Sequence, residues 1–168
     1  MYSYYDLTVP VFSKTLGGLR TILEKDIDFG LTDEFLTATL ADDMFPFVKQ
    51  VQIACDNAKG AAARLAGVEV PSFPDTEATL GDLVVRIDAT LAFLATLTPE
   101  QFVDAGETMV TLPYYPGTYM AGHEYLIQFA LPNFFFHVSQ AYALSRRAGV
   151  PLGKADYLNG VPLRPLEG

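Results

Sequence analysis

Four long amphipathic segments, separated by helix stop signals, are the feature that most constrains the fold of this chain. Their apolar residues recur at the three- and four-residue spacing of one helix face, as in Leu80, Leu83, Val84, Ile87, Leu91 and Leu94. Gly30, Gly67 and Gly149 stand where three segments end, as expected after a helix C-terminus. The sequence therefore predicts helices over residues 8–29, 43–66, 75–97 and 120–148, and a non-helical tail over 149–168.

Amphipathic helices without a strong strand pattern indicate an all-α fold, and four of them suit a four-helix bundle. The length of 168 residues suits one domain over 1–168 with a core of its own. We expect short helical turns at residues 32–40 and after the capping box at 98–101. Residues 107–119 are rich in proline and glycine, so an extended segment or small hairpin should precede the last helix.

Composition excludes some classes of partner. A formal net charge of -9 repels phosphate backbones, so we expect no nucleic acid partner. No apolar run approaches the roughly 20 residues that cross a bilayer, so we expect no membrane association either. Cys55 is the only cysteine and the N-terminus carries no signal-peptide pattern, which leads us to expect a cytoplasmic protein.

The strongest candidate site lies in the last helix, where polar residues interrupt an apolar face. Asn133, His137 and Gln140 align at helical spacing, and Pro132 should kink the helix beside them. Buried polar side chains need hydrogen-bond partners, so they either repair the local backbone or line a pocket. We favour a pocket, because three aligned polar groups exceed what one backbone defect requires.

The second predicted helix contributes Gln52 and Asp56 to this candidate pocket. Gln52 lies beside an apolar face and can turn inward, whereas Asp56 has the spacing of a surface ion pair with Lys59. The predicted pocket residues are His137, Asn133, Gln52, Gln140 and Asp56. His123 lies about 21 Å before His137 along a straight helix, so the two histidines cannot chelate one ion from that helix.

The register His137-Val138-Ser139-Gln140, followed by Tyr142, Arg146 and Gly149, resembles the last helix of the DinB/YfiT-like superfamily. The resemblance implies an up-down-down-up bundle and, for many members, a divalent metal such as zinc or nickel held by three histidines. It puts His137 at one ligand position, Asn133 at a second and Gln52, to within a residue or two, at the third. Amide oxygens are weak ligands for these metals, so the resemblance implies a degenerate metal site without a cofactor.

Longer stretches are similar to an uncharacterised domain-of-unknown-function branch of the same superfamily. They are the stretches 43–46, 50–56, 129–137 and 149–156. No activity is established for that branch, so whether the chain is an enzyme stays open.

Two hypotheses about function follow. The first is a non-catalytic or small-ligand-binding homodimer with a polar pocket around His137. The alternative is a divergent metal-dependent enzyme that acts on a thiol or small hydrolysable substrate. It would bind metal through His137, Asn133 and Gln52, with further donors from Asp56, Asp156 or His123.

Overall fold

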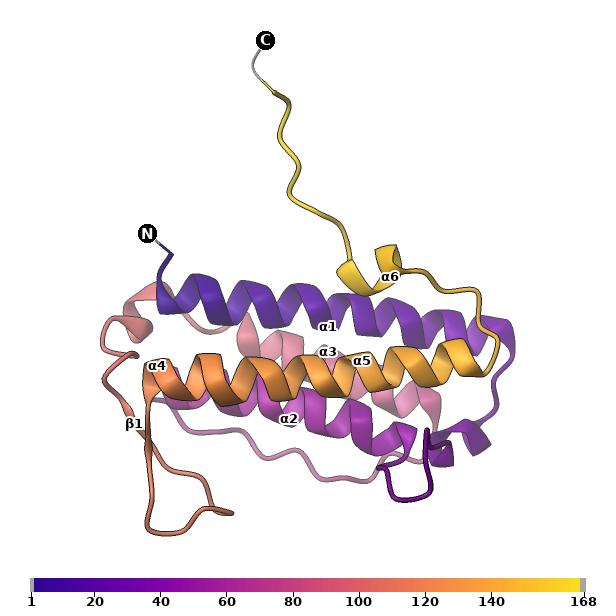
Figure 1. Ribbon diagram of the computed structural model, residues 1–168, viewed down its shortest axis with the longest axis horizontal. Coiled ribbons are helices and arrows are strands. Elements are labelled where there is room, and N and C mark those ends of the chain that lie inside the picture. Colours follow the sequence, from indigo (N-terminus) through magenta and orange to yellow (C-terminus); the bar gives the residue numbers. More distant parts are fainter. Residues whose placement is uncertain (1, 167–168) are drawn as a thin grey trace.

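Four long helical segments pack side by side in the computed structural model, which describes residues 2–166 (Figure 1). They are α1 (Tyr4–Phe29), α2 (Phe47–Ala66), α3 (Leu80–Leu94) and a last helix that runs from α4 (Gly122–Glu124) into α5 (Leu131–Arg147). In Figure 1, α1 and α5 run in one direction and α2 and α3 in the other. This confirms the all-α four-helix bundle with up-down-down-up order.

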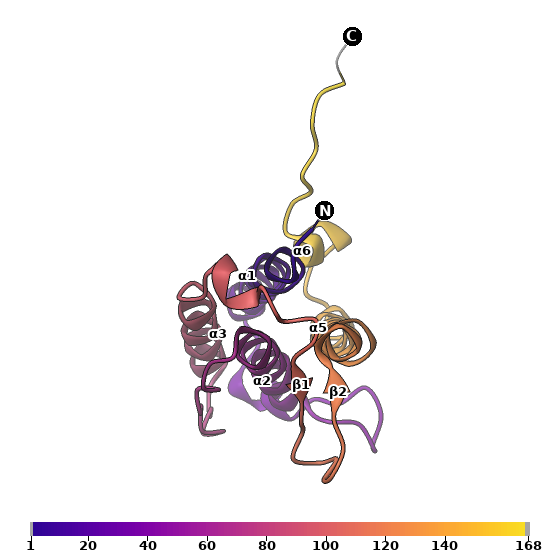
Figure 2. The ribbon, with the colours of Figure 1, turned by 90° about the vertical axis from the view of Figure 1, so that its left-hand side faces the viewer.

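The end-on view shows which helices are neighbours (Figure 2). Helix α2 packs against α5 and α3, while α1 packs against α3, α5 and the short helix α6 (Lys154–Leu158). Because α2 and α3 are parallel, residues 68–79 must return along the whole bundle. An extended chain advances about 3.3 Å per residue and a helix only 1.5 Å, so this segment spans α2 easily.

Helix α1 begins earlier than the predicted residue 8. Ser3 and Asp6 form a capping box, in which the Asp6 backbone N–H donates to Ser3 Oγ and the Ser3 N–H donates to Asp6 Oδ2. Thr8 is therefore not a cap, and its hydroxyl donates to the Tyr4 carbonyl inside the first turns. Pro10 is the seventh residue of α1, where it lacks the N–H that would donate to the Asp6 carbonyl.

The predicted starts of the second and third helices are wrong by several residues. Helix α2 begins at Phe47 after Pro46, and Asp42 and Asp43 lie in an exposed loop instead of capping it. Helix α3 begins at Leu80 and not at 75, because Thr79 and Asp82 form its capping box. The acidic residues before it, Asp75 and Glu77, pair with cations on α2 and α3 instead of starting a helix.

The last helix carries a π-helical segment before its proline. Residues Tyr125–Ala130 (η3) are π-helical, and the Leu131 N–H donates to the Leu126 carbonyl, five residues back. Pro132 has no N–H to donate, so a local change of register accommodates it where we had expected a kink. The helix proper starts at Gly122 and not at 120, because Met120 belongs to a strand.

Short elements connect these helices much as expected. A 3-10 helix η1 (Asp33–Thr37) and another, η2 (Pro99–Phe102), occupy the two predicted helical turns. Strands β1 (Met109–Val110) and β2 (Met120–Ala121) pair antiparallel with Val110 opposite Met120, which confirms the expected hairpin. The tail differs from expectation because it contains helix α6, whose Asp156 accepts a hydrogen bond from the Gly153 N–H.

The core lies between all four helical segments and consists of large side chains around an alanine-rich α2. Ala54, Ala58, Ala61 and Ala62 are fully buried, so the neighbouring helices approach α2 closely. Phe12 of α1 meets Phe134 of α5 edge to face, with ring centroids 4.8 Å apart. Within residues 2–166, no helix is both long and apolar enough to cross a membrane.

Helix α6 docks on α1 where two glycines leave room for it. A Cβ on Gly18 would lie 3.0 Å from the Asp156 carbonyl oxygen, and Asn159 donates to the Lys14 carbonyl nearby. Lys25 on α1 also pairs with Asp156. These contacts hold α6 beside α1, and the chain after α6 extends away from the bundle (Figure 1).

We expect Gly18→Ala to destabilise the protein by about 1–3 kcal/mol, because the added methyl group overpacks against rigid backbone of α6. Hydrogen exchange of residues 154–158 should accelerate in this variant. Gly81→Ala is the matched control, since a Cβ there meets only ordinary contact and should stabilise α3 by about 0.5–1 kcal/mol. Equal stability of the two variants would contradict the tight α1–α6 contact.

Candidate functional site

Two buried polar clusters lie on opposite sides of α2. The His137 cluster joins His137 of α5 to Gln50 of α2 and to the Phe45 carbonyl. The Arg86 cluster gathers around one arginine of α3 and comprises Arg86, Gln52, Asp56, Asp75 and Glu77. Sequence patterns had placed residues of both clusters in one pocket.

The hydrogen bonds of the His137 cluster define the tautomer of His137. The Gln50 side-chain N–H donates to the Phe45 carbonyl at 2.8 Å, because a carbonyl oxygen can only accept. The Gln50 oxygen Oε1 therefore faces the imidazole. Oε1 lies 2.7 Å from His137 Nδ1 and must accept from it. Nδ1 therefore carries the proton, and Nε2 keeps a free lone pair while the ring is neutral.

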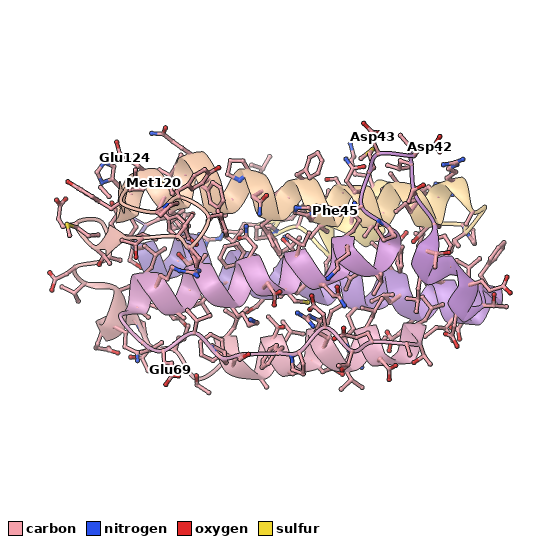
Figure 3. The ribbon with its side chains drawn as sticks, turned by 90° about the horizontal axis from the view of Figure 1, so that it is seen from below. Asp42, Asp43, Phe45, Glu69, Met120 and Glu124 are labelled. Carbon is pink, nitrogen blue, oxygen red and sulfur yellow. The ribbon has the colours of Figure 1, made fainter. Side chains whose placement is uncertain are left out.

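Burial keeps the imidazole in that neutral form. His137 is 6% exposed, and this burial lowers its pKa below the ordinary value. Residues 2–166 supply no hydrogen-bond partner for Nε2. Figure 3 shows Phe45, half exposed, near the boundary of α2 and α5, with Asp42 and Asp43 farther along the same loop. The arrangement offers one uncharged acceptor beneath a loop.

Asn133 and Gln140 flank His137 on α5, one turn to either side, and both are half-buried. The Gln140 side-chain oxygen Oε1 is buried without a hydrogen-bond partner in residues 2–166. A buried acceptor of this kind ordinarily has water or a ligand as its partner. Asn133, His137 and Gln140 lie at successive turns of α5, as the sequence pattern predicted.

The Arg86 cluster is an ionic network that fastens residues 68–79 to the bundle. The Arg86 side chain is only 2% exposed, and its two terminal nitrogens lie 2.7 Å from Asp56 and Glu77 and 3.0 Å from Asp75. It also donates to the Pro74 carbonyl. Lys49 and Lys59 add pairs to Asp75 and Asp56. Charge compensation of this density permits an arginine to be buried.

Gln52 and Asp56 belong to this ionic network and not to the His137 cluster. The Gln52 side-chain N–H donates to Glu77 at 2.6 Å, and Asp56 pairs with both Lys59 and Arg86. Gln50, two residues before Gln52, takes the position opposite His137 instead. This offset of two residues lies within the uncertainty with which the resemblance placed the α2 ligand position.

The donors do not fit a tight zinc or nickel centre. His137 offers only Nε2, and the other side chains of its cluster offer amide oxygens, which bind these metals weakly. Within residues 2–166, no group of three or more His, Cys, Asp and Glu side chains could hold a metal ion.

The further donors that a metal enzyme would need have other partners. Asp156 caps α6 and pairs with Lys25, and His123 Nδ1 lies 3.0 Å from the Gly106 carbonyl. Cys55 is fully buried, and burial raises the pKa of its thiol to about 12, so it stays protonated and unreactive. Asp156, His123 and Cys55 therefore supply neither a further metal ligand nor a thiol nucleophile beside His137.

A family of unknown function matches nearly the whole chain. The matching model is described as "Domain of unknown function (DUF1993)" and covers residues 4–158. The chain belongs to the DUF1993 family. No curated protein matches it. A crystal structure of a DinB family member protein from Shewanella denitrificans is similar, with 39% identity, a TM-score of 0.91 and coverage of 96% of this chain and 95% of that one.

The structural match agrees with the DinB-like resemblance in the last helix. This DUF1993 chain thus has a DinB-like bundle.

One further buried carboxyl escaped the sequence analysis of this DUF1993 protein. Asp26 near the end of α1 is fully buried, and Ser145 of α5 donates to its Oδ2 at 2.8 Å. Its Oδ1 has no partner in residues 2–166, and burial raises the pKa of Asp26 to about 7. An isolated aspartate within an amphipathic pattern gives no signal that distinguishes it from a surface residue.

We expect Arg86→Met to destabilise the protein by about 3–5 kcal/mol, because it leaves the nearly buried Glu77 carboxylate without its cation. Residues 68–79 should then exchange amide hydrogens faster. Arg20→Met, which breaks a more exposed ion pair with Asp88, should cost about 1 kcal/mol or less. Urea unfolding checks both values, and a similar cost for both variants would refute the role of the network.

Asp26 should make stability fall as pH rises. Its pKa is raised on folding, so its favourable contribution is complete below the ordinary pKa of 3.8 and is lost by about pH 7. Asp26→Asn does not titrate. Across this window the wild type should lose a few kcal/mol relative to the variant, at about 1.4 kcal/mol per pKa unit. Urea unfolding of both proteins at a series of pH values measures this difference, and parallel pH profiles would contradict it.

Proposed function

We propose that this protein binds a small polar molecule at the α2–α5 face, in a non-catalytic role, with His137 Nε2 accepting a hydrogen bond from it. The observation that carries the proposal is the 2.7 Å contact between His137 Nδ1 and Gln50 Oε1. This contact orients the imidazole and leaves Nε2 as an uncharged acceptor. The proposed site is a degenerate form of the family's metal site.

The polar groups around His137 support a ligand with hydrogen-bond donors. Nε2 and the unpartnered Gln140 Oε1 are both acceptors, and they lie three residues apart on α5, where side chains are neighbours. The half-buried amide of Asn133 lies one turn earlier and can both donate and accept. Small amides, alcohols and amines match this pattern, because each supplies an O–H or N–H group.

The alternative of a metal-dependent enzyme finds less support. His137 is the histidine of the proposed site, and Asp56, Asp156 and His123 are held elsewhere by Arg86, Lys25 and the Gly106 carbonyl. The expected homodimer and the cytoplasmic location stay predictions.

Nitrogen-15 NMR tests the proposed state of His137. We expect a neutral ring with the proton on Nδ1 at neutral pH, and a pKa below the ordinary histidine value. His123 is the other histidine of the chain and supplies a second signal in the same spectra. A protonated ring, or a proton on Nε2, would contradict the proposal.

Binding is tested with acetamide, propanol and methylammonium by saturation-transfer NMR. We expect at least one probe to bind and its affinity to fall about tenfold in His137→Phe, the usual effect of losing about 1.4 kcal/mol. Asn133→Ala keeps the imidazole and should weaken binding less, while Ser139→Ala, on an exposed side of α5, should bind like the wild type. Tight stoichiometric zinc or nickel binding that His137→Phe abolishes would establish the metal alternative instead.

A further inference from the structure

A cavity of about 450 Å³ lies at the far end of α2 from Gln50, beside the β1–β2 hairpin. Its wall includes Arg64 of α2 and, from the hairpin, Leu112, Tyr115, Thr118 and Tyr119. An adjoining cavity of about 340 Å³ shares those four hairpin residues and reaches Phe129 of the last helix. Figure 2 shows the strands beside α2 and α5, with the hairpin extending away from the bundle. The volumes suit a small organic molecule.

Arg64 differs from the other basic residues that are at least half-buried. Carboxylates pair with all of these others, namely Arg20, Lys25, Lys49, Lys59 and Arg86. Arg64 is half-buried, yet no acidic side chain of residues 2–166 forms an ion pair with it. In a chain of net charge -9, an unpaired guanidinium facing a cavity is an unused site for an anion.

The position of the Arg64 guanidinium depends on a glycine one turn earlier. A Cβ on Gly60 would lie 2.5 Å from Arg64 Nη1, and the three atoms nearest to it would all belong to the Arg64 guanidinium. The guanidinium therefore lies back along α2, over the space that Gly60 leaves. It also lies close to the buried phenol of Tyr125, where it opposes the rise in the Tyr125 pKa that burial causes.

Aromatic rings supply the rest of the cavity's chemistry. Tyr115 packs edge to face with Tyr114, at 5.4 Å between centroids, and Tyr114 and Tyr115 both lie within 6.5 Å of the Phe129 ring. Phe129 in turn stacks on Tyr125 at 5.9 Å. An aromatic cluster beside a cation accommodates a planar ring that carries a negative group.

We propose that this cavity binds a small aromatic anion, whose carboxylate or phosphate pairs with Arg64 while its ring packs against Tyr115 and Tyr119. The site is separate from the His137 cluster, because Arg64 and Gln50 are about 21 Å apart along α2. Binding at the Arg64 cavity and binding at the His137 cluster can therefore be tested independently.

NMR titration of the full chain with benzoate, phenyl phosphate, benzamide and acetate tests the proposal. We expect benzoate or phenyl phosphate to shift the amide signals of residues 60–64 and 115–119. Benzamide, which has the ring without the charge, and acetate, which has the charge without the ring, should each bind at least about tenfold more weakly. The comparison of benzoate with phenyl phosphate shows which anionic group the site prefers.

Variants separate the role of Arg64 from effects on folding. Arg64→Met should weaken binding of the better anion about tenfold or more. Gly60→Ala keeps the arginine and adds helix propensity, so it should fold normally while displacing the guanidinium and weakening binding. Lys154→Met removes one exposed positive charge from α6, on another part of the molecule, and should bind like the wild type.

Three outcomes would overturn the proposal. They are equal affinity for benzoate and benzamide, unchanged binding in Arg64→Met, and signal shifts that fall outside residues 60–64 and 115–119.

Discussion

The buried guanidinium of Arg86 is the interaction on which the bundle order depends. Two parallel neighbours, α2 and α3, require a connection that returns along the bundle, and residues 68–79 make this return without secondary structure of their own. Arg86 pairs with Asp75 and Glu77 from that connection and with Asp56 from α2. One cation thus joins α2, α3 and the connection between them. An apolar residue at this position would weaken the attachment of the connection and leave the Glu77 carboxylate without its cation.

Helical periodicity predicted the bundle because each long helix has an apolar face that only burial explains. The ends of the helices were harder to predict from the sequence. Asp42, Asp43 and Asp75 are all good capping residues, yet only tertiary pairing decides that Asp75 meets Lys49 and Arg86. Ser3 caps α1 although Thr8 and Pro10 form an equally plausible start. Helix α6 was missed because its five residues are too few for a periodic signal, and its stability comes from docking on α1.

The structure keeps the predicted α5 residues together on one helix, whereas it separates the predicted α2 residues from them. Helix α5 has a clear apolar face, so polar residues on that face stand out. Helix α2 is buried on several sides by η1, α3 and α5, and glutamines at two neighbouring positions, Gln50 and Gln52, both point inward but in different directions. A sequence pattern with one buried face cannot distinguish them. The sequence pattern does not single out Arg64 either, because an arginine near a helix end is usually solvated.

The π-helical segment before Pro132 has a consequence for how the last helix presents its side chains. A π turn inserts one residue into the helical repeat, which rotates everything after it by about 100° relative to everything before it. Gly122, upstream, is therefore buried in one phase, and His137, downstream, meets Gln50 of α2 in another. Side chains before and after the π turn of this continuous helix thus follow helical repeats that are rotated relative to each other. The β1–β2 hairpin and the His137–Gln50 contact thus lie on opposite sides of the π-helical segment.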